Sequence, residues 1–233
     1  NNAVSTVQRA AIAPLVWSNP VGTFNNAITL GVTNLPGFAT RFTTDLSDPL
    51  PSSLILTNLY VLDGGPVVSL KLRAYNPDLG ASAVLSNLVY TFQVGTPKVE
   101  PPGTNTTNGV SVTLSSITTN AALFWTLNGS EPSSSNGTRY TNGSPILVDS
   151  TGLLKVKGIR SAYLDSETVT NEFKFTVAAP TVTPLAAVTN NAVPVSMASG
   201  TIGAEIYYTV NGTEPSPTNG IRYTSTFPLA LNS

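Results

Sequence analysis

The chain contains no cysteine and no histidine. These side chains usually hold zinc, haem and iron–sulfur groups, so the sequence predicts no such site and no thiol chemistry. A Ser-His-Asp triad and histidine acid–base catalysis are excluded for the same reason. Because cysteine is absent, no domain is cross-linked by a disulfide bond. We therefore expect no catalytic residue, no cofactor and no metal.

Charged residues are also scarce. The chain has 11 Lys and Arg and 12 Asp and Glu, which together make up 10% of its 233 residues. No basic run is present, so nucleic acid is not an expected partner. No apolar stretch reaches the roughly 18 residues of a membrane-spanning helix, so no span is expected. The richness in Ser, Thr and Asn suits a secreted or cell-surface protein. The start at Asn1, without an initiator methionine or a signal-like apolar core, indicates a processed protein or a piece of a longer one.

What the chain does contain is a repeat. Asn128-Gly129-Ser130-Glu131-Pro132 recurs as Asn211-Gly212-Thr213-Glu214-Pro215, 83 positions later. A degraded version, Asp45-Leu46-Ser47-Asp48-Pro49, lies 83 positions earlier. A repeat of this length indicates tandem small domains. The same interval separates Pro14, Pro97 and Pro180, and it separates Phe42, Trp125 and Tyr208.

Helix signals are nearly absent, and the pattern predicts an all-β chain. Apolar residues alternate over short runs, as at Val110, Val112 and Leu114, and Gly, Pro, Asn and Ser separate the runs. About seven such runs in one repeat match the size and turn spacing of a Greek-key, immunoglobulin-like β-sandwich. We expect these sandwiches to lie end to end.

The repeat divides the chain into an amino-terminal strand segment at 1–13, a divergent first unit at 14–96, a second unit at 97–179 and a third unit at 180–233. The third unit has no counterpart of 151–177, so its last two strands are expected to be missing. The joints between units are short and are not Gly/Ser linkers, which predicts a stiff rod.

Three strand alignments follow from the repeat. Leu70-Lys71-Leu72-Arg73 matches Leu154-Lys155-Val156-Lys157 with a one-residue shift. Tyr90 to Val94 matches Phe173 to Val177, and Pro228 to Leu231 is aligned with Pro145 to Val148.

Two segments resemble a known family. Tyr207 to Pro215, followed by Arg222-Tyr223, resembles the carboxy-terminal domain of chitobiase and β-hexosaminidase, and Phe124 to Pro132 with Arg139-Tyr140 does so too. The shared pattern is an aromatic strand, then Asp/Asn-Gly-Ser/Thr-x-Pro, then a tyrosine. The first unit keeps only part of it. The resemblance implies an immunoglobulin-like sandwich, often present in tandem in secreted bacterial proteins, and it implies no catalysis.

The recurring motif is expected to be a structural turn. Asn-Gly predicts a tight type I′ hairpin turn, with positive φ at the glycine at least. Glu131 is expected to pair with Arg139, and Glu214 with Arg222, and to fix the hairpin rather than bind a ligand. The motif residues are Asn128, Gly129, Glu131 and Pro132, and Asn211, Gly212, Glu214 and Pro215.

Other candidate sites have structural alternatives. Phe42, Trp125 and Tyr208 could form a sugar-stacking platform, but their alternating slot favours the sandwich core, and Phe124 and Tyr207 are better candidates for a contact surface. Asp45 and Asp48 are the nearest carboxylate pair, yet they lie on a turn and not across a cleft as glycosidase chemistry requires. A calcium site there is a further alternative. Candidate glycosylation sequons begin at Asn105, Asn128, Asn136, Asn142 and Asn211.

Three function classes compete. The first is a non-catalytic structural subunit of a filament, sheath, surface layer or adhesive stalk. The second is an accessory or spacer stretch of a larger secreted carbohydrate-active enzyme, and the third is a binding module such as a carbohydrate-binding adhesin. The stiff repeats and the lack of chemistry-bearing residues favour the first. The expected partners are other copies of the chain or neighbouring repeats of a longer chain, with glycans as further candidates.

The ends of the chain suggest how such a subunit assembles. Val4 to Ala13 aligns with the closing strand Tyr90 to Val94, and the third unit is short of strands. One hypothesis is head-to-tail strand complementation, in which 1–13 of one copy completes the third unit of the next. The other is that these residues are a window of a longer repeat array.

Overall fold

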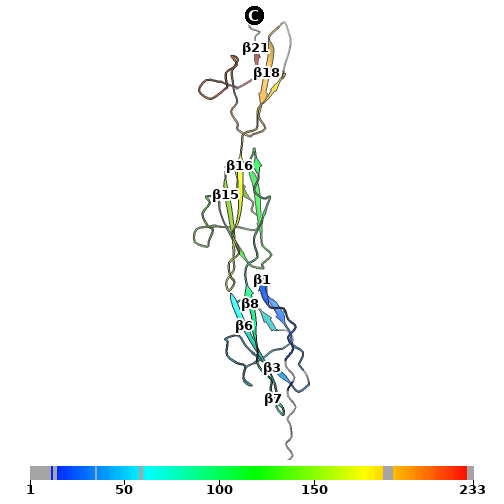
Figure 1. Cartoon of the computed structure of the whole chain (residues 1–233). Helices are drawn as coiled ribbons and strands as arrows, with labels where there is room; N and C mark the ends of the chain where they lie inside the picture. The colour runs from blue at the N-terminus through cyan, green and yellow to red at the C-terminus, as the bar shows by residue number, and fades with distance from the viewer. Residues whose placement is uncertain (1–11, 13–14, 35, 58–59, 186–190, 230–233) are drawn as a thin grey trace, which may run out of the picture.

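The computed structural model describes residues 12, 15–34, 36–57, 60–185 and 191–229. These residues form strands and no helix, which confirms the predicted all-β class. The same part of the chain therefore offers no helix long and apolar enough to cross a bilayer. The strands gather in three groups that follow one another along one long axis (Figure 1). Apart from Ile12, the predicted segment 1–13 lies outside the described residues.

The second unit shows the architecture most completely. Its strands are β9 (Lys98–Glu100), β10 (Asn105–Thr106), β11 (Val110–Ser115), β12 (Ala122–Thr126), β13 (Thr138–Arg139), β14 (Ile146–Val148), β15 (Gly152–Ile159) and β16 (Val169–Phe175). One sheet has the order β10-β16-β15-β12-β13 and the other the order β14-β11-β9. This is an immunoglobulin-like sandwich, in which β9, β11 and β14 take the places of strands A, B and E, and β12, β15 and β16 those of C, F and G.

Alternation of side chains produces the core of the second unit. Val112 and Leu114 of β11 face Leu154 and Val156 of β15, and each of the four is buried. The residues between them are polar or half-exposed, so each strand has one inward face, as expected for an antiparallel sheet with one side in water. Phe173 of β16, fully buried, closes the same cluster.

The first unit repeats this plan. Its strands are β1 (Gly22–Phe24), β2 (Ile28–Leu30), β3 (Ala39–Thr43), β4 (Leu54–Ile55), β5 (Tyr60–Leu62), β6 (Val67–Asn76), β7 (Gly80–Ala81) and β8 (Leu85–Phe92). The large sheet runs β1-β8-β6-β3-β4 and the small one is β2-β5. Phe42 lies opposite Leu72, as Trp125 lies opposite Val156, so the predicted one-residue shift between the units is present.

The third unit contains β17 (Thr181–Thr183), β18 (Val193–Ala198), β19 (Tyr207–Tyr208), β20 (Ile221–Arg222) and β21 (Phe227–Leu229). They form the sheets β17-β18-β21 and β19-β20. Val193 pairs with Leu229, whereas Val110 of the second unit pairs with Val148. The alignment of Leu231 with Val148 is therefore wrong by two residues. A slip of two keeps the same residues facing inward, which is why alternation alone did not reveal it.

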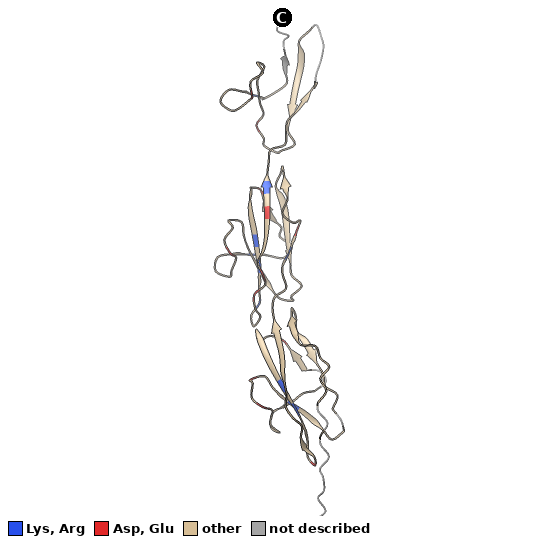
Figure 2. Cartoon of the chain, viewed as in Figure 1, with Lys and Arg blue, Asp and Glu red and all other residues tan. Residues whose placement is uncertain are grey.

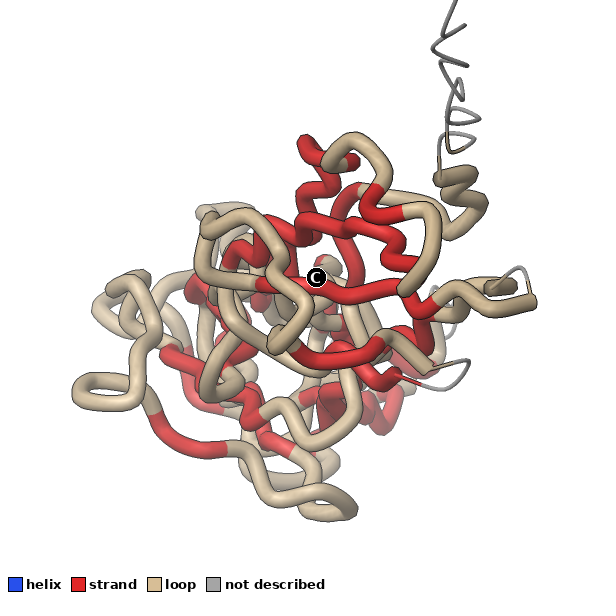
Figure 3. Tube along the Cα trace, turned by 90° about the horizontal axis from the view of Figure 1, so that it is seen from below, coloured by secondary structure: helices blue, strands red, loops and turns tan. Residues whose placement is uncertain are grey.

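The units differ in how much core they bury. Among the side chains described in 181–185 and 191–226, only Val195 is buried. Seen from below, the strands overlap around the centre of the molecule and loops project from it (Figure 3). In the part of the chain that the structure describes, charged residues are few and do not gather into a patch of one sign (Figure 2). The predicted boundaries near Pro97 and Pro180 precede β9 and β17 and stay predictions.

Candidate functional site

The joint between the first and second units is built around one asparagine. Asn26, in the loop before β2, donates from Nδ2 to the carbonyl of Ile117 at 2.9 Å. Its Oδ1 accepts the backbone N–H of Thr119 at 2.8 Å. The backbone N–H of Gly95 donates to Oγ1 of buried Thr118 at 2.8 Å. One side-chain amide and one hydroxyl thus hold the loop between β11 and β12 against the end of the first unit.

The joint between the second and third units has the same construction. Asn108 donates to the carbonyl of Gly200 at 2.9 Å and accepts the N–H of Ile202 at 2.8 Å. The N–H of Ala178 donates to Oγ1 of Thr201 at 2.8 Å. This joint was not predicted from the sequence. Two recurring features of the sequence could have revealed it. Asn26 and Asn108 are each followed by a small residue and then a β-branched one, and Ser-x-Thr occurs at both 116–118 and 199–201.

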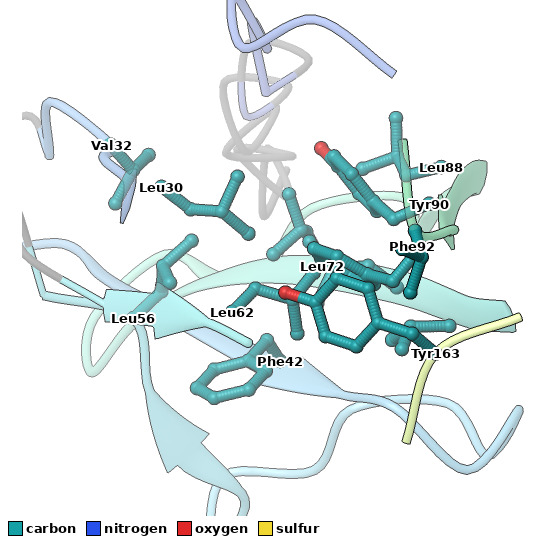
Figure 4. Close-up of a cluster of buried hydrophobic side chains, with 13 residues drawn as sticks. Leu30, Val32, Phe42, Leu56, Leu62, Leu72, Leu88, Tyr90, Phe92 and Tyr163 are labelled. Atoms are coloured by element: carbon teal, nitrogen blue, oxygen red, sulfur yellow. The ribbon is translucent and has the colours of Figure 1, made fainter. Parts of the chain in front are cut away.

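The first joint has an additional contact. The loop between β15 and β16 places Tyr163 in the core cluster of the first unit, where its ring lies 5.4 Å from that of Phe92 (Figure 4). The backbone of Leu164 donates to the carbonyl of Phe92 at 2.8 Å and accepts the N–H of Val94 at 2.9 Å. The second unit therefore supplies one side chain to the core of the first and continues its hydrogen bonding.

Two charged groups accompany Tyr163. Its hydroxyl donates to Oδ1 of Asp63 at 2.6 Å, and Arg160 pairs with the same carboxylate at 3.0 Å. Burial, and then the bond to Asp63, raise the pKa of Tyr163 to about 12. The guanidinium of Arg160 also lies 4.1 Å from the centre of the Tyr163 ring.

The recurring motif is a turn stabilised by side chains. In the second unit Oδ1 of Asn128 accepts the backbone N–H of Ser130 at 3.1 Å, and Thr126 donates to the carbonyl of Ser130 at 2.6 Å. The predicted positive φ at the two glycines is confirmed, with 76° at Gly129 and 77° at Gly212. The predicted type I′ hairpin is wrong: Asn128 is not among the residues of positive φ, and β13 begins only at Thr138. The asparagine side chain caps the turn instead of adopting a left-handed backbone.

The same turn is present in the other two units. Asp45 accepts the N–H of Ser47 at 3.1 Å, and Asn211 accepts that of Thr213 at 3.2 Å. The bond from Ser47 lowers the pKa of Asp45. Leu46 stands in the place of the glycine and has φ 70°, a conformation unfavourable for a side chain with a Cβ. The degraded first motif has therefore kept its geometry at the expense of backbone strain.

The acid of the motif pairs with lysine and not with arginine. Glu131 lies 3.3 Å from Lys157 and 3.7 Å from Lys155, both on β15, and it accepts a bond from Thr168. The Thr168 bond and then Lys157 lower the pKa of Glu131. The predicted Glu131–Arg139 pair is therefore wrong. In the first unit Asp48 makes the equivalent contact, 2.7 Å from Lys71 of β6, which lowers the pKa of that carboxyl.

The predicted Glu214–Arg222 pair is also wrong. Arg222 lies 2.7 Å from Glu205, which occupies the position of Ala122 in the second unit. Among the described residues, no cation lies within ion-pair distance of Glu214. The Glu131–Arg139 prediction was wrong because the cations that Glu131 meets, Lys155 and Lys157, lie on strand F, far from it in the sequence.

The aromatic residues divide as follows. Phe42 is buried, Trp125 is half-buried against the core of the second unit, and Tyr208 is half-buried. Phe124 and Tyr207, the candidate contact surface, are half-buried too, because each covers a glycine of the following loop. A Cβ on Gly137 would lie 3.1 Å from that of Phe124, and a Cβ on Gly220 would lie 3.1 Å from that of Tyr207.

The five sequon asparagines are all exposed, but their amides differ. Asn136 donates to the carbonyl of Glu131 at 2.7 Å and accepts from Ser133, and Asn128 and Asn211 cap their turns. No side-chain hydrogen bond holds Asn105 or Asn142 within the described part of the chain. Glycosylation at any of the five stays a prediction.

A surface hollow of about 480 Å³ lies beside the first joint. Thr118, Arg139, Tyr140 and Asn142 line part of it, and no carboxylate does. The ring of Tyr140 packs against the core of the second unit and is not presented as a flat platform. The hollow therefore offers polar groups for a small ligand but no acid–base pair for glycoside hydrolysis.

One comparison with known proteins shows the family. The family model described as "Chitobiase/beta-hexosaminidase C-terminal domain" matches residues 100–170 and 184–233. No curated protein matches the chain. Three solved structures are similar at low identity. The first is a chain in the crystal structure of mouse coronavirus receptor-binding domain complexed with its murine receptor, at 17% identity, with 66% of this chain and 96% of that chain covered and a TM-score of 0.26.

Murine CEACAM1b is similar at 15% identity, with 67% of this chain and 96% of that chain covered and a TM-score of 0.24. The FN1-FN3 domains of chicken CNTN1 are similar at 13% identity, with 87% of this chain and 81% of that chain covered and a TM-score of 0.23. These scores are too low to support a fold argument, and the immunoglobulin-like assignment depends on the strand order described above.

Proposed function

Because the chain belongs to the chitobiase/β-hexosaminidase C-terminal domain family, we propose that it is a non-catalytic structural protein of an extracellular or cell-surface assembly. The observation that carries this proposal is the joint made by Asn26 and repeated by Asn108 with the same hydrogen-bond lengths. A joint used twice fixes the spacing and direction of successive units, which is what a filament, sheath, surface layer or adhesive stalk requires of its subunit.

The joints favour a stiff rod over a flexible string. Each one adds at least three hydrogen bonds between units, and bonds of this kind contribute roughly 1 kcal/mol each in net terms. The first joint adds the buried ring of Tyr163. Linkers that permit free motion are long and rich in Gly and Ser, unlike these.

The absence of catalysis is part of the proposal. The family domain takes its name from the carboxy-terminal part of the enzymes and not from their catalytic part. The chain has no histidine or cysteine, and the hollow beside the first joint has no carboxylate. We expect no hydrolysis of chitin-like oligosaccharides by the purified chain. Hydrolysis that one carboxylate substitution abolishes would contradict this.

Assembly would proceed through completion of the third unit by strands from outside it. In one route, 1–13 of a second copy supplies a strand head-to-tail; in the other, the strands belong to a longer repeat array. Deleting 1–13 separates the routes. If the shortened chain assembles as the full chain does, the first route is excluded and the array remains.

A second candidate is a spacer of a larger secreted carbohydrate-active enzyme, or of a carbohydrate-binding adhesin. The family match favours it, since the family is defined from such enzymes. Electron microscopy of the native material distinguishes the candidates. Filaments or sheets whose repeat matches the rod support the structural subunit, and isolated particles joined to a catalytic domain support the spacer.

A further inference from the structure

The hollow beside the first joint contains a cation that has no acid of its own. Arg139 of β13 lines this hollow, whose volume is about 480 Å³. Within the described part of the chain, no carboxylate lies within ion-pair distance of Arg139, and no acceptor binds its guanidinium. The other described arginines each donate to a carbonyl or carboxylate oxygen: Arg41, Arg73, Arg160 and Arg222. An unpaired cation in a concave wall favours an anionic ligand.

The third unit shows what an arginine at this position binds. Arg222 lies 83 positions after Arg139, and its guanidinium is 2.7 Å from Oε1 of Glu205. The hydroxyl of Tyr207 donates to Oε2 of the same carboxylate at 2.9 Å. In the third unit, therefore, the arginine holds a carboxylate that the chain itself supplies.

The second unit has the same framework without that acid. The pairing of β12 with β13 has the same register as the pairing of β19 with β20. The position of Glu205 is occupied by Ala122, which lines the hollow together with Arg139. Because alanine has only a methyl group, the place that a carboxylate takes beside the arginine in the third unit stays open in the second.

The remaining wall of the hollow carries hydroxyl and amide groups. Ser115, Thr141 and Asn142 line it and are exposed. None of these three side chains is held by a hydrogen bond from the described residues. Hydroxyl and amide groups both donate and accept, as the hydroxyl groups of a sugar do. The wall therefore suits a ligand that carries several hydroxyl groups as well as a negative charge.

We propose that this hollow binds an acidic sugar residue of the uronic acid type. The carboxylate of the sugar takes the place that Glu205 fills in the third unit and pairs with Arg139. The sugar hydroxyls bond to Ser115, Thr141 and Asn142. The arginine–carboxylate pair is charge-assisted, so it selects acidic sugars over neutral ones.

The repeat predicts a single site of this kind among the three units. In the first unit, Ile55 occupies the position of Arg139, so no cation is present there. In the third unit, Glu205 already fills the position beside Arg222. The inference goes beyond the proposed function and does not rest on it, because the hollow belongs to one chain and needs no second copy.

The experiment titrates the full chain with sodium glucuronate and follows the backbone amide shifts by NMR. The chain is produced in bacteria, so that Asn142 carries no glycan. Glucose, which has no carboxylate, and sodium acetate, which has no hydroxyl groups, are the matched ligands. We expect saturable shifts at Ser115 and at 139–142, and an affinity for glucuronate at least roughly fivefold higher than for glucose or acetate.

Substitutions test the role of the arginine. Arg139→Gln should weaken glucuronate binding at least roughly fivefold, and Arg139→Lys should retain part of it because the charge is kept. Ala122→Glu places an acid where the third unit has one, so it should abolish binding. Arg222→Gln changes the equivalent arginine of the third unit and is the matched control, for which binding should be unchanged. Unaltered amide shifts away from the substitution show that each variant is folded.

Three results overturn the inference: no saturable shift at the hollow, equal affinities for glucuronate and for either glucose or acetate, or equal effects of Arg139→Gln and Arg222→Gln. Binding is measured on single chains and does not depend on polymerisation. Glucuronate binding by a chain that forms no filament therefore contradicts the proposed function alone, and filaments of a chain that does not bind glucuronate contradict the inference alone.

Discussion

The hydroxyl of Tyr163 donates a 2.6 Å hydrogen bond to Asp63, and the two residues belong to different units. Tyr163 lies 100 positions further along the chain, in the loop between β15 and β16, yet only 7% of it is exposed and it is part of the core cluster of the first unit. The first unit is therefore completed by its neighbour. We therefore expect its stability to depend on the second unit being folded and in place.

Replacing this tyrosine tests the dependence. Tyr163→Ala should lower the free energy of unfolding of the first unit by roughly 3–5 kcal/mol, the usual cost of removing a buried aromatic ring. Tyr163→Phe keeps the ring and loses only the bond to Asp63, so about 1–2 kcal/mol is expected. Denaturant unfolding, with hydrogen exchange to assign the signal to each unit, measures both. If Tyr163→Ala weakens only the second unit, the shared core is not what stabilises the joint.

The same tyrosine predicts an alkaline transition. Its pKa of about 12 is raised above the ordinary value near 10 by burial first, so the folded joint favours the neutral phenol. A raised pKa contributes stability that is fully present below about pH 10 and is lost as the pH rises towards 12. Phenolate absorbance should show a late-titrating tyrosine that disappears in Tyr163→Phe. A variant with an unchanged titration curve would assign the late step to another residue.

The asparagines at the joints predict a change of shape more than a change of stability. Asn26→Ala and Asn108→Ala each remove two hydrogen bonds to the backbone of the next unit, worth roughly 1 kcal/mol each. The double variant should bend more, with a broader range of angles between units in electron micrographs and a smaller radius of gyration. Asn105→Ala, at an exposed site outside the joints, is the control. If the unaltered chain, the double variant and Asn105→Ala are equally rigid, the backbone alone determines the angle between units.

The turn motif predicts opposite effects at equivalent positions. Gly129→Val places a β-branched residue at φ 76° and should destabilise the second unit by roughly 1 kcal/mol or more. Leu46→Gly removes a Cβ from φ 70°, and because Leu46 is 65% exposed little packing is lost, so the first unit should gain up to about 1 kcal/mol. Thermal unfolding of the two variants shows whether each one lowers or raises the melting temperature. A melting temperature unchanged in both would mean that the turn relaxes without strain.

Sequence alone determined much of this protein. The 83-residue repeat, the all-β class and the one-residue shift between Leu72 and Val156 follow from local alternation and from spacing, which are properties of a chain read in order. Tertiary structure decided the contacts between distant segments. Glu131 meets Lys155 and Lys157 and not the nearer Arg139, because strand F lies beside strand C in the folded sheet. Tyr163 enters the first core for the same kind of reason. At Asn26 the sequence does show a recurring local pattern, but which segment the asparagine holds depends on where the loops meet in space.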